Sequence, residues 1–308
     1  MAFGQEMRQE GAGMPITIPD NLPSRWILES EGIFVMNHGS AQRQDLRPLH
    51  LALVQPSPDL RSARRIAALV ANSPLHIDLT YVVLGSSSGT GDGIPAGAIH
   101  GLEAVAKSSF DGVIAAHAHV DHLDWHQVPC WDEFRDFLDW SEERIRARLF
   151  IGWSAQAALQ HVYGLERRLL AEPLVGLRSC SPVRKNSYLM RGFDDAFDIT
   201  LDCAAIVDEG DVLQTPGLRV LAASQEVGAY LVRNANRRDV FVLGQPDGDP
   251  LAVLPAEPQE GLHREASERN RQALGCRTHA SLLFMNWLNF YVYQPFSSLV
   301  DISIPDPR

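Results

Sequence analysis

The stretch RLFIGWSAQAALQHVYG, residues 148–164, reads as an apolar strand that runs into a helix through a turn at Gly152-Trp153-Ser154. A chain that turns this sharply at the end of a buried strand usually does so to raise one side chain above the sheet as a nucleophile. Gly152 has no side chain to raise. The stretch therefore predicts a strand-turn-helix unit of an α/β sheet, but it does not indicate the function of the turn.

The composition narrows the range of partners. The chain has 308 residues, of which 45% are hydrophobic, so it is globular and long enough for one large domain or two small ones. Its formal net charge of -11 repels phosphate backbones and anionic membranes, and no block of Lys or Arg offsets that charge. We therefore expect a small-molecule substrate, and neither a nucleic acid nor a membrane.

Cysteine usage points to a reducing compartment. The cysteines show no CxxC spacing, and the first residues show no basic and apolar signal pattern. The longest apolar runs, such as 281–293, are broken by Asn and are too short to span a bilayer. We expect a cytoplasmic protein with four free thiols: Cys130, Cys180, Cys203 and Cys276.

Short apolar runs and helical patterns alternate along the chain. Residues 1–13 show no periodicity and predict a disordered leader, so we expect one domain over 14–308. Helical spacing of apolar residues predicts helices over 59–72 and 131–147. Buried strands are predicted from Leu49 to Val54, Ile77 to Val83, Gly112 to Ala116, Leu149 to Gly152, Arg219 to Ala223, Ala229 to Val232 and Asp239 to Leu243.

This alternation predicts an α/β fold with a mostly parallel sheet, helices on both faces and an antiparallel edge extension over 219–243. Two polar loops, 85–97 and 245–261, carry no GxGxxG or GxxxxGK spacing, so we assign them no phosphate site. In open α/β sheets the ligand lies beyond the carboxyl ends of the strands. We expect the site at four segments: Gln55-Pro56-Ser57, the stretch after Ala116, the Gly152 turn and Gln245-Pro246-Asp247.

Several longer motifs resemble one family. They are MPITIPDNLP (14–23), IFVM (33–36), QDLRPL (44–49), NSPLHIDL (72–79), FDGVI (110–114), RGFDDAF (191–197) and NWLNFYVYQ (286–294). With these motifs the chain resembles the homoserine O-succinyl- and O-acetyltransferases over nearly its whole length. The resemblance implies a flavodoxin-like fold of the class I glutamine amidotransferase kind and a homodimer.

The resemblance also implies a mechanism that this chain cannot follow. In the family, a Cys on the strand-helix turn takes the acyl group from acyl-CoA, a His activates the Cys, and a Glu orients the His. These three positions fall here on Gly152, Gln245 and Asp247. A Gly cannot form an acyl-enzyme, and a Gln cannot carry a proton at neutral pH. Two substrate-contacting positions of the family, a Lys and a Ser, fall on Pro173 and Asp202.

Two functions stay open for the turn. Ser154 is either a replacement nucleophile or, as is usual for a Ser at the start of a helix, a cap. The backbone N–H groups of Trp153 and Ser154 can form a cradle for a carboxylate or an oxyanion without side-chain chemistry. Gly152, Trp153, Gln245 and Asp247 are therefore predicted as substrate-binding residues.

A histidine cluster, HAHVDHLDWH, follows directly after a predicted strand. Its HxHxDH spacing is also the metal-binding signature of the metallo-β-lactamase superfamily, which the rest of the chain does not resemble. His117, His119, Asp121 and His122 are therefore candidate ligands of zinc or another divalent metal. The alternatives are acid-base or substrate-binding roles for His117 and His119, which lie nearest the strand end, or a solvated loop.

Five other acidic or basic positions favour an amino-acid-like ligand. Arg191, with Asp194 and Asp195, either contacts an amino-acid substrate or belongs to a packing segment. Asp202 and Asp247 would form acidic walls that favour a ligand with an amine.

Four functions remain open at this point. The first is an enzyme, in specialised biosynthesis, that acts on an amino-acid-like or acyl-thioester substrate by non-covalent catalysis. The second is a metal-dependent hydrolase or lyase, the third is a non-catalytic binding relative, and the fourth is orthodox homoserine acylation through Ser154.

Overall fold

The computed structural model describes residues 16–17, 35–36, 48–57, 59–85, 97–253 and 262–293, with side chains at all of these except 16–17, 35–36 and 262–269. The predicted leader, residues 1–13, lies outside the described residues, as do 86–96 and 254–261 of the two polar loops.

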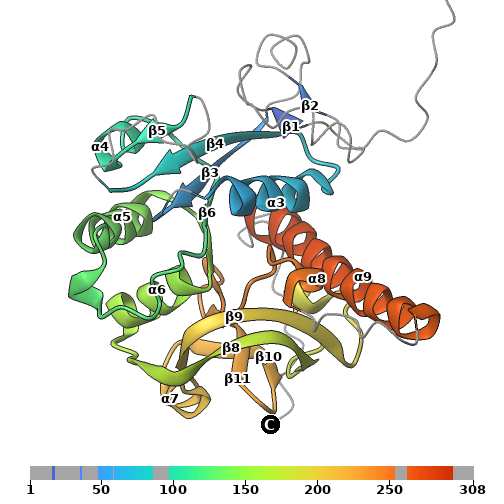
Figure 1. Cartoon of the computed structure of the whole chain (residues 1–308). Helices are drawn as coiled ribbons and strands as arrows, with labels where there is room; N and C mark the ends of the chain where they lie inside the picture. The colour runs from blue at the N-terminus through green and yellow to red at the C-terminus, as the bar shows by residue number, and fades with distance from the viewer. Residues whose placement is uncertain are drawn as a thin grey trace, which may run out of the picture.

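The described strands form one sheet, in the order β2-β1-β4-β3-β6-β7-β12-β11-β10-β8-β9, with β5 paired to β4 (Figure 1). Every pair from β2 to β12 is parallel, and every pair from β12 to β9 is antiparallel. The strands are β1 Ile16–Thr17, β2 Val35–Met36, β3 Leu49–Gln55, β4 Ile77–Val83, β5 Ile99–His100, β6 Gly112–Ala115, β7 Ala147–Ile151, β8 Arg167–Pro182, β9 Phe197–Val207, β10 Leu218–Ser224, β11 Gly228–Asn234 and β12 Asp239–Val242.

Helices cover both faces of the parallel part, as Figure 1 shows with α5 and α6 on one side and α3 and α9 on the other. Alternate residues of β3 explain this arrangement, because Leu51 and Leu53 pack with α3 and α9 whereas Ala52 and Val54 pack with α5 and α6. The helices are α3 Leu60–Ala71, α4 Leu102–Val105, α5 Trp131–Arg144, α6 Trp153–Tyr163, α7 Glu209–Gln214, α8 Pro250–Val253 and α9 Leu262–Trp287; shorter turns are η1 Trp125–Gln127, η2 Tyr188–Met190 and the π-helical η3 Leu288–Tyr293.

The predicted fold class is confirmed, with two corrections. The second predicted helix, 131–147, ends at Arg144, and Ala147 already belongs to strand β7. The sequence analysis also missed β8 and β9, which pair with each other and form the end of the antiparallel extension. Most residues of β8 are exposed or half-buried, so this strand lacks the continuous apolar run that identifies a buried strand.

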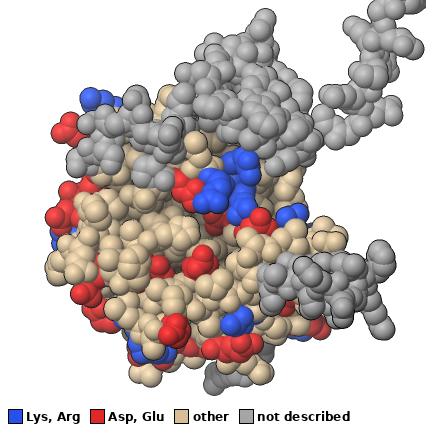
Figure 2. Space-filling view, in the orientation of Figure 1, with Lys and Arg blue, Asp and Glu red and all other residues tan. Residues whose placement is uncertain are grey.

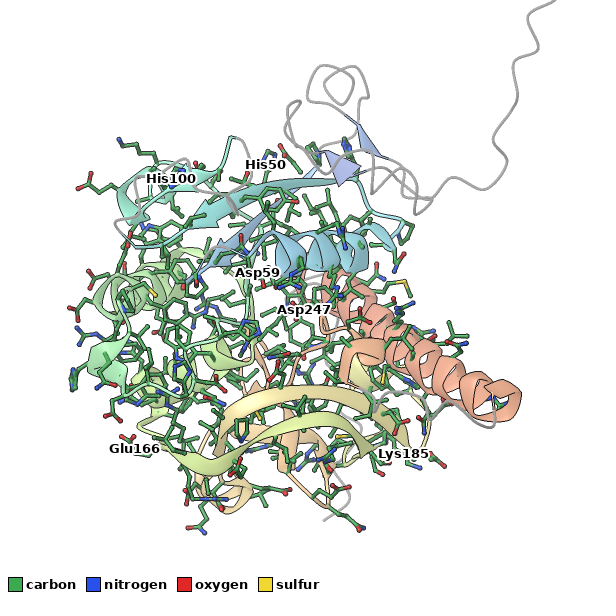
Figure 3. The ribbon with its side chains drawn as sticks, viewed as in Figure 1. His50, Asp59, His100, Glu166, Lys185 and Asp247 are labelled. Carbon is green, nitrogen blue, oxygen red and sulfur yellow. The ribbon has the colours of Figure 1, made fainter. Side chains whose placement is uncertain are left out.

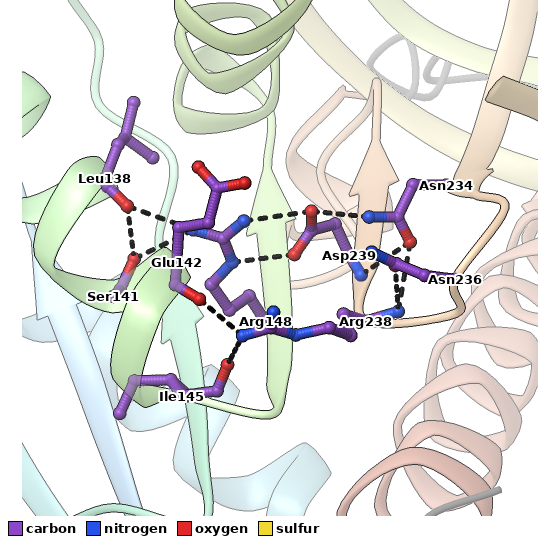
Figure 4. A network of polar contacts seen from close by, with 9 residues as sticks. All are labelled: Leu138, Ser141, Glu142, Ile145, Arg148, Asn234, Asn236, Arg238 and Asp239. Carbon is purple, nitrogen blue, oxygen red and sulfur yellow. Dashed lines mark hydrogen bonds and ion pairs between the residues drawn. The ribbon is translucent and has the colours of Figure 1, made fainter. Parts of the chain in front are cut away.

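A buried ion pair joins β7 to β12 near the start of both strands (Figure 4). Nε and Nη2 of Arg148 donate to the two carboxylate oxygens of Asp239, at 2.6 and 2.9 Å. Nη1 of Arg148 donates to the Leu138 carbonyl and the Ser141 hydroxyl of α5, and Asn234 donates to Asp239. The charged groups are both paired and hydrogen-bonded, as a buried ion pair must be. The network fixes β12 and α5 on the strand that leads to Gly152.

The four cysteines are free, as predicted. Within the described residues, no helix is long and apolar enough to cross a membrane.

Candidate active site

The four predicted segments lie at the carboxyl ends of four neighbouring parallel strands. They follow β3, β6, β7 and β12, which are adjacent in the sheet in that order. The rule that places ligands at the carboxyl ends of parallel strands therefore brings these segments to one edge, as the sequence analysis predicted.

The turn between β7 and α6, residues Ile151–Trp153, is called the elbow here. Gly152 has φ 56° and ψ -120°, a backbone conformation that side-chain-bearing residues rarely adopt. Its N–H donates to the Val242 carbonyl of β12, so the turn is fixed to the sheet. Glycine adopts this conformation without steric strain. The turn therefore keeps the backbone geometry of a strand-turn-helix unit that displays a nucleophile.

His117 fills the space that a side chain at position 152 would need. A Cβ built on Gly152 would lie 2.9 Å from Cγ of His117, and closer still to Nδ1. Such distances are shorter than any real Cβ contact. The imidazole at 117 must therefore shift before a side chain can be placed at 152.

The His117 ring also accepts a hydrogen bond from a backbone N–H of the elbow. The Trp153 N–H donates to Nδ1 of His117 at 3.1 Å. Burial, reinforced by the neighbouring His119, lowers the pKa of His117 to about 3, so the ring is neutral at physiological pH. Because Nδ1 accepts a hydrogen bond, the single ring proton sits on Nε2, which is buried and has no partner among the described residues.

This contact corrects two predictions. The Trp153 amide is not an open anion cradle, because His117 already accepts its hydrogen bond. His117 is not a free general base, because its basic nitrogen is engaged and the residue is 5% exposed.

Ser154 does neither of the two tasks predicted for it. It is fully buried, and its hydroxyl donates to the Ala116 carbonyl at 2.6 Å. It makes no capping bond, since Gly152 stands at the N-cap of α6. Ser154 therefore ties α6 to the end of β6, and its oxygen is not displayed to a substrate.

An exposed imidazole and a carboxylate stand beside this buried group. Nε2 of His119 lies 4.0 Å from Oδ2 of Asp202, and the two side chains are 63% and 43% exposed. The His119 ring meets the His117 ring edge-on, with 4.7 Å between ring centroids. Nε2 of Gln245 donates to the Asp202 carbonyl at 2.7 Å. The structure thus gathers His119, Asp202 and Gln245 near the elbow, as predicted.

Asp247 turns towards α3 instead. Its Oδ2 accepts a hydrogen bond from the Ser62 hydroxyl at 2.5 Å, while Oδ1 is buried without a partner among the described residues. Burial raises the pKa of Asp247. Figure 3 places Asp247 close to Asp59 at the N-terminal end of α3. Asp247 therefore belongs to a second group of polar residues on the same edge.

The four candidate metal ligands do not converge. Asp121 accepts a hydrogen bond from the Ala204 N–H at 2.5 Å and is buried, whereas His119 and His122 are exposed. Within the described part of the chain, no group of three or more His, Cys, Asp or Glu side chains could hold a metal ion. The prediction that His117, His119, Asp121 and His122 form a metal site is corrected by this arrangement.

Arg191 packs on another part of the molecule. Its guanidinium carbon lies 5.9 Å from the ring centroid of Phe290, and its carbonyl accepts from Asn286. Asp194 pairs with His279 of α9. These contacts join the segment to α9 and η3, and none of them involves the elbow.

The sequence analysis missed Ser62 and gave Gln55 no role of its own at the site edge. Ser62 lies on the first turn of α3, which was predicted only as an amphipathic helix, and Gln55 was named only as part of a strand-end segment. The signal for Gln55 was its position as the last residue of a buried strand. No signal in the sequence pairs Ser62 with Asp247, because 185 positions separate them.

Solved structures with a similar fold define the class. A glutamine amidotransferase from Thermotoga maritima aligns with a TM-score of 0.52 and 12% identity, covering 80% of this chain and 99% of that chain. The glutaminase domain of Trypanosoma brucei CTPS with bound acivicin aligns with a TM-score of 0.51 and 12% identity, covering 80% and 97%. The protein thus has the α/β fold of the class I glutamine amidotransferases, with glycine at the elbow.

Sequence comparison then identifies the family. The model of the homoserine O-succinyltransferase family matches residues 15–298. Homoserine O-succinyltransferases of Shewanella loihica and Shewanella baltica are 36% and 34% identical to this chain, covering 91% of it and 92% and 94% of their own lengths. The chain belongs to the homoserine O-succinyltransferase family, a family of acyltransferase enzymes, as the motifs predicted.

Proposed function

We propose that this protein is a divergent acyltransferase of the homoserine family that moves an acyl group from a thioester directly to an amino-acid-like acceptor, without an acyl-enzyme. The observation that carries the proposal is the imidazole of His117 in the space of the side chain that the family resemblance places at position 152. With that space filled and Ser154 buried, neither position of the elbow offers a nucleophile.

His119 is the base in this proposal. It is exposed beside the elbow, and Oδ2 of Asp202 lies 4.0 Å from its Nε2. The acceptor's hydroxyl oxygen attacks the thioester carbonyl carbon, and His119 takes the hydroxyl proton. The C–S bond then breaks, and the leaving thiolate receives that proton. Asp202 orients His119 and does not itself transfer a proton.

Mass spectrometry and kinetics test the proposal together. After incubation with succinyl-CoA or acetyl-CoA, the intact protein should show no acyl adduct, since no described residue at the elbow can carry one. His119→Gln should lower kcat/KM for acyl transfer to L-homoserine by about 10²–10⁴-fold, the usual contribution of a general base. His122→Gln is the matched control, because His122 is an exposed imidazole in the same segment.

Two results would overturn this function. One is a stable acyl adduct on the protein, and the other is acyl transfer that survives unchanged in His119→Gln.

One specific observation favours a second candidate function, a non-catalytic binding relative. The contact between His117 and Trp153 occupies the elbow's amide donor. If the protein binds amino-acid-like ligands and thioesters but shows no turnover above the background rate, the binding function replaces the catalytic one.

A further inference from the structure

A second group of polar residues lies where α3 begins, at the same edge of the sheet as the elbow. Gln55 ends β3, and its Nε2 donates to the Asp59 carbonyl at 2.7 Å. A carbonyl can only accept, so this bond fixes which end of the Gln55 amide is nitrogen. The other end, Oε1, is then an acceptor that is buried without a partner among the described residues. Gln55 itself is 1% exposed.

Asp247 brings a second acceptor to the same helix turn. Its Oδ2 is held by the Ser62 hydroxyl of α3, and its Oδ1 is also buried without a partner among the described residues. Asp247 is 7% exposed. Asp59, the N-cap of α3, uses its carboxylate to accept the N–H groups of Arg61 and Ser62. Two unsatisfied oxygens thus approach the first turn of α3 from β3 and from the loop after β12.

The cation nearest to this group is engaged elsewhere. Nη2 of Arg65 pairs with Asp249 at 2.9 Å, and Nη1 contacts the backbone carbonyl of Asp247 at 3.5 Å. Neither contact reaches the Asp247 carboxylate. Figure 2 shows this face hollowed between the basic side chains over α3 and the acidic ones below them.

An acceptor-only group of this kind fits one chemical class of ligand. A buried oxygen without a hydrogen bond costs about 1–3 kcal/mol, and more when the group is charged, so a ligand that supplies donors gains that energy on binding. A primary ammonium group has three N–H donors and no acceptor. Among the described residues, no group of three or more His, Cys, Asp or Glu side chains could hold a metal ion.

We propose that Asp247 and Gln55 form a subsite for the primary ammonium group of the ligand, with Ser62 holding the Asp247 carboxylate in place. The inference rests on the proposed function in one respect only, because it names the amine of the amino-acid-like acceptor as the group bound. Asp247 is two residues from Gln245, which contacts Asp202 beside His119. A ligand anchored by its amine at Asp247 would therefore extend towards the His119 and Asp202 pair.

Calorimetry on the full chain tests the subsite with matched ligand pairs. L-homoserine is compared with 4-hydroxybutyrate, which lacks only the amine, and 3-aminopropanol with 1-propanol. The amines should bind at least about tenfold more tightly than their partners without an amine, since one charge-assisted hydrogen bond contributes about 1.5–3 kcal/mol. This comparison needs no variant, so it stands even if a substitution impairs folding.

Variants then locate the effect. Asp247→Asn and Gln55→Met should each weaken amine binding and leave binding of the partners without an amine unchanged. Asp249→Asn is the control, because Asp249 is a carboxylate of the same loop that already pairs with Arg65. Equal binding of the amines and their partners without an amine would overturn the subsite, as would failure of both amines to bind below about 10 mM.

The outcome is separable from that of the proposed function. Acyl transfer that persists without any preference for the amine overturns only the subsite. Amine binding that depends on Asp247, in a protein that transfers no acyl group, overturns only the catalytic function.

Discussion

Nδ1 of His117 lies closer to the position of a Cβ on residue 152 than non-bonded atoms of two residues approach each other. The imidazole therefore stands in place of the side chain that the turn would otherwise display. The same nitrogen accepts the Trp153 amide hydrogen. His117, in the segment that follows β6, thus fills the space that a nucleophile would need. It also accepts the hydrogen bond of a backbone N–H that could otherwise bind an oxyanion.

This relationship predicts strong coupling between positions 117 and 152. Gly152→Ala should destabilise the protein by about 2–6 kcal/mol, because it combines a strained backbone at φ 56° with a clash against the ring. In a His117→Gly background the same substitution should cost only the backbone strain, about 1–3 kcal/mol. Chemical denaturation of the four proteins gives the coupling energy. Additive effects would show that the ring moves aside at no cost.

The parallel half of the fold could be predicted from the sequence because its strands are buried on both faces. β3, β4 and β7 are mostly apolar, and their predicted bounds agree with the structure to within two residues at each end. β8 was not recognised, since its side chains are largely half-buried or exposed and it contains two prolines. A strand of that kind is defined by its partner β9 rather than by its own sequence.

The site was predictable in position but not in contacts. The strand-end rule brought Gln55, His117, Gly152 and Gln245 to one edge of the sheet, as the structure confirms. Which atoms meet there depends on side-chain packing between distant segments. The 2.6 Å bond from Ser154 to Ala116 spans 38 positions, and no local pattern encodes such a contact.

Stability should fall with acid because of His117. The unfolded chain binds a proton at this residue as the pH falls below its ordinary pKa of 6.5, whereas the native protein does so only near the lowered pKa of about 3. Between these values the unfolded state holds more protons, so the free energy of unfolding decreases as pH decreases, by at most about 1.4 kcal/mol per pH unit from this group. Urea denaturation at a series of pH values between 3 and 6.5 measures the slope.

The matched comparison for this slope uses an exposed ring of the same segment. His117→Gln should flatten the pH dependence, whereas His122→Gln, at an exposed side chain, should leave the slope as in the parent protein. An unchanged slope in His117→Gln would mean that other groups cause the acid sensitivity.

The buried ion pair between Arg148 and Asp239 should contribute far more to the free energy of unfolding than an exposed ion pair does. Arg148→Met leaves the Asp239 carboxylate buried without its cation, and removal of one partner of a buried pair costs about 3–5 kcal/mol. Lys185→Ala, which breaks the exposed pair with Asp195, should cost less than about 1 kcal/mol. Thermal and urea unfolding of both variants check the contrast. A small loss in Arg148→Met would show that the carboxylate finds another donor or becomes protonated.

Reintroducing a thiol at the elbow provides the sharpest check on the role of His117. Gly152→Cys alone should not yield a reactive thiol, because the ring occupies the space of its side chain. In the double variant His117→Gly/Gly152→Cys the thiol gains that space and the Trp153 amide is released, so one additional cysteine should react rapidly with iodoacetamide. The four native cysteines should react slowly with iodoacetamide, because burial keeps their thiols protonated. It raises the pKa of Cys130 to about 11 and that of Cys180, Cys203 and Cys276 to about 12. Alkylation followed by intact-mass analysis counts the fast sites. Rapid alkylation at position 152 while His117 is still present would mean that the imidazole leaves the elbow readily, and its place there would then be a resting position rather than a replacement for the nucleophile.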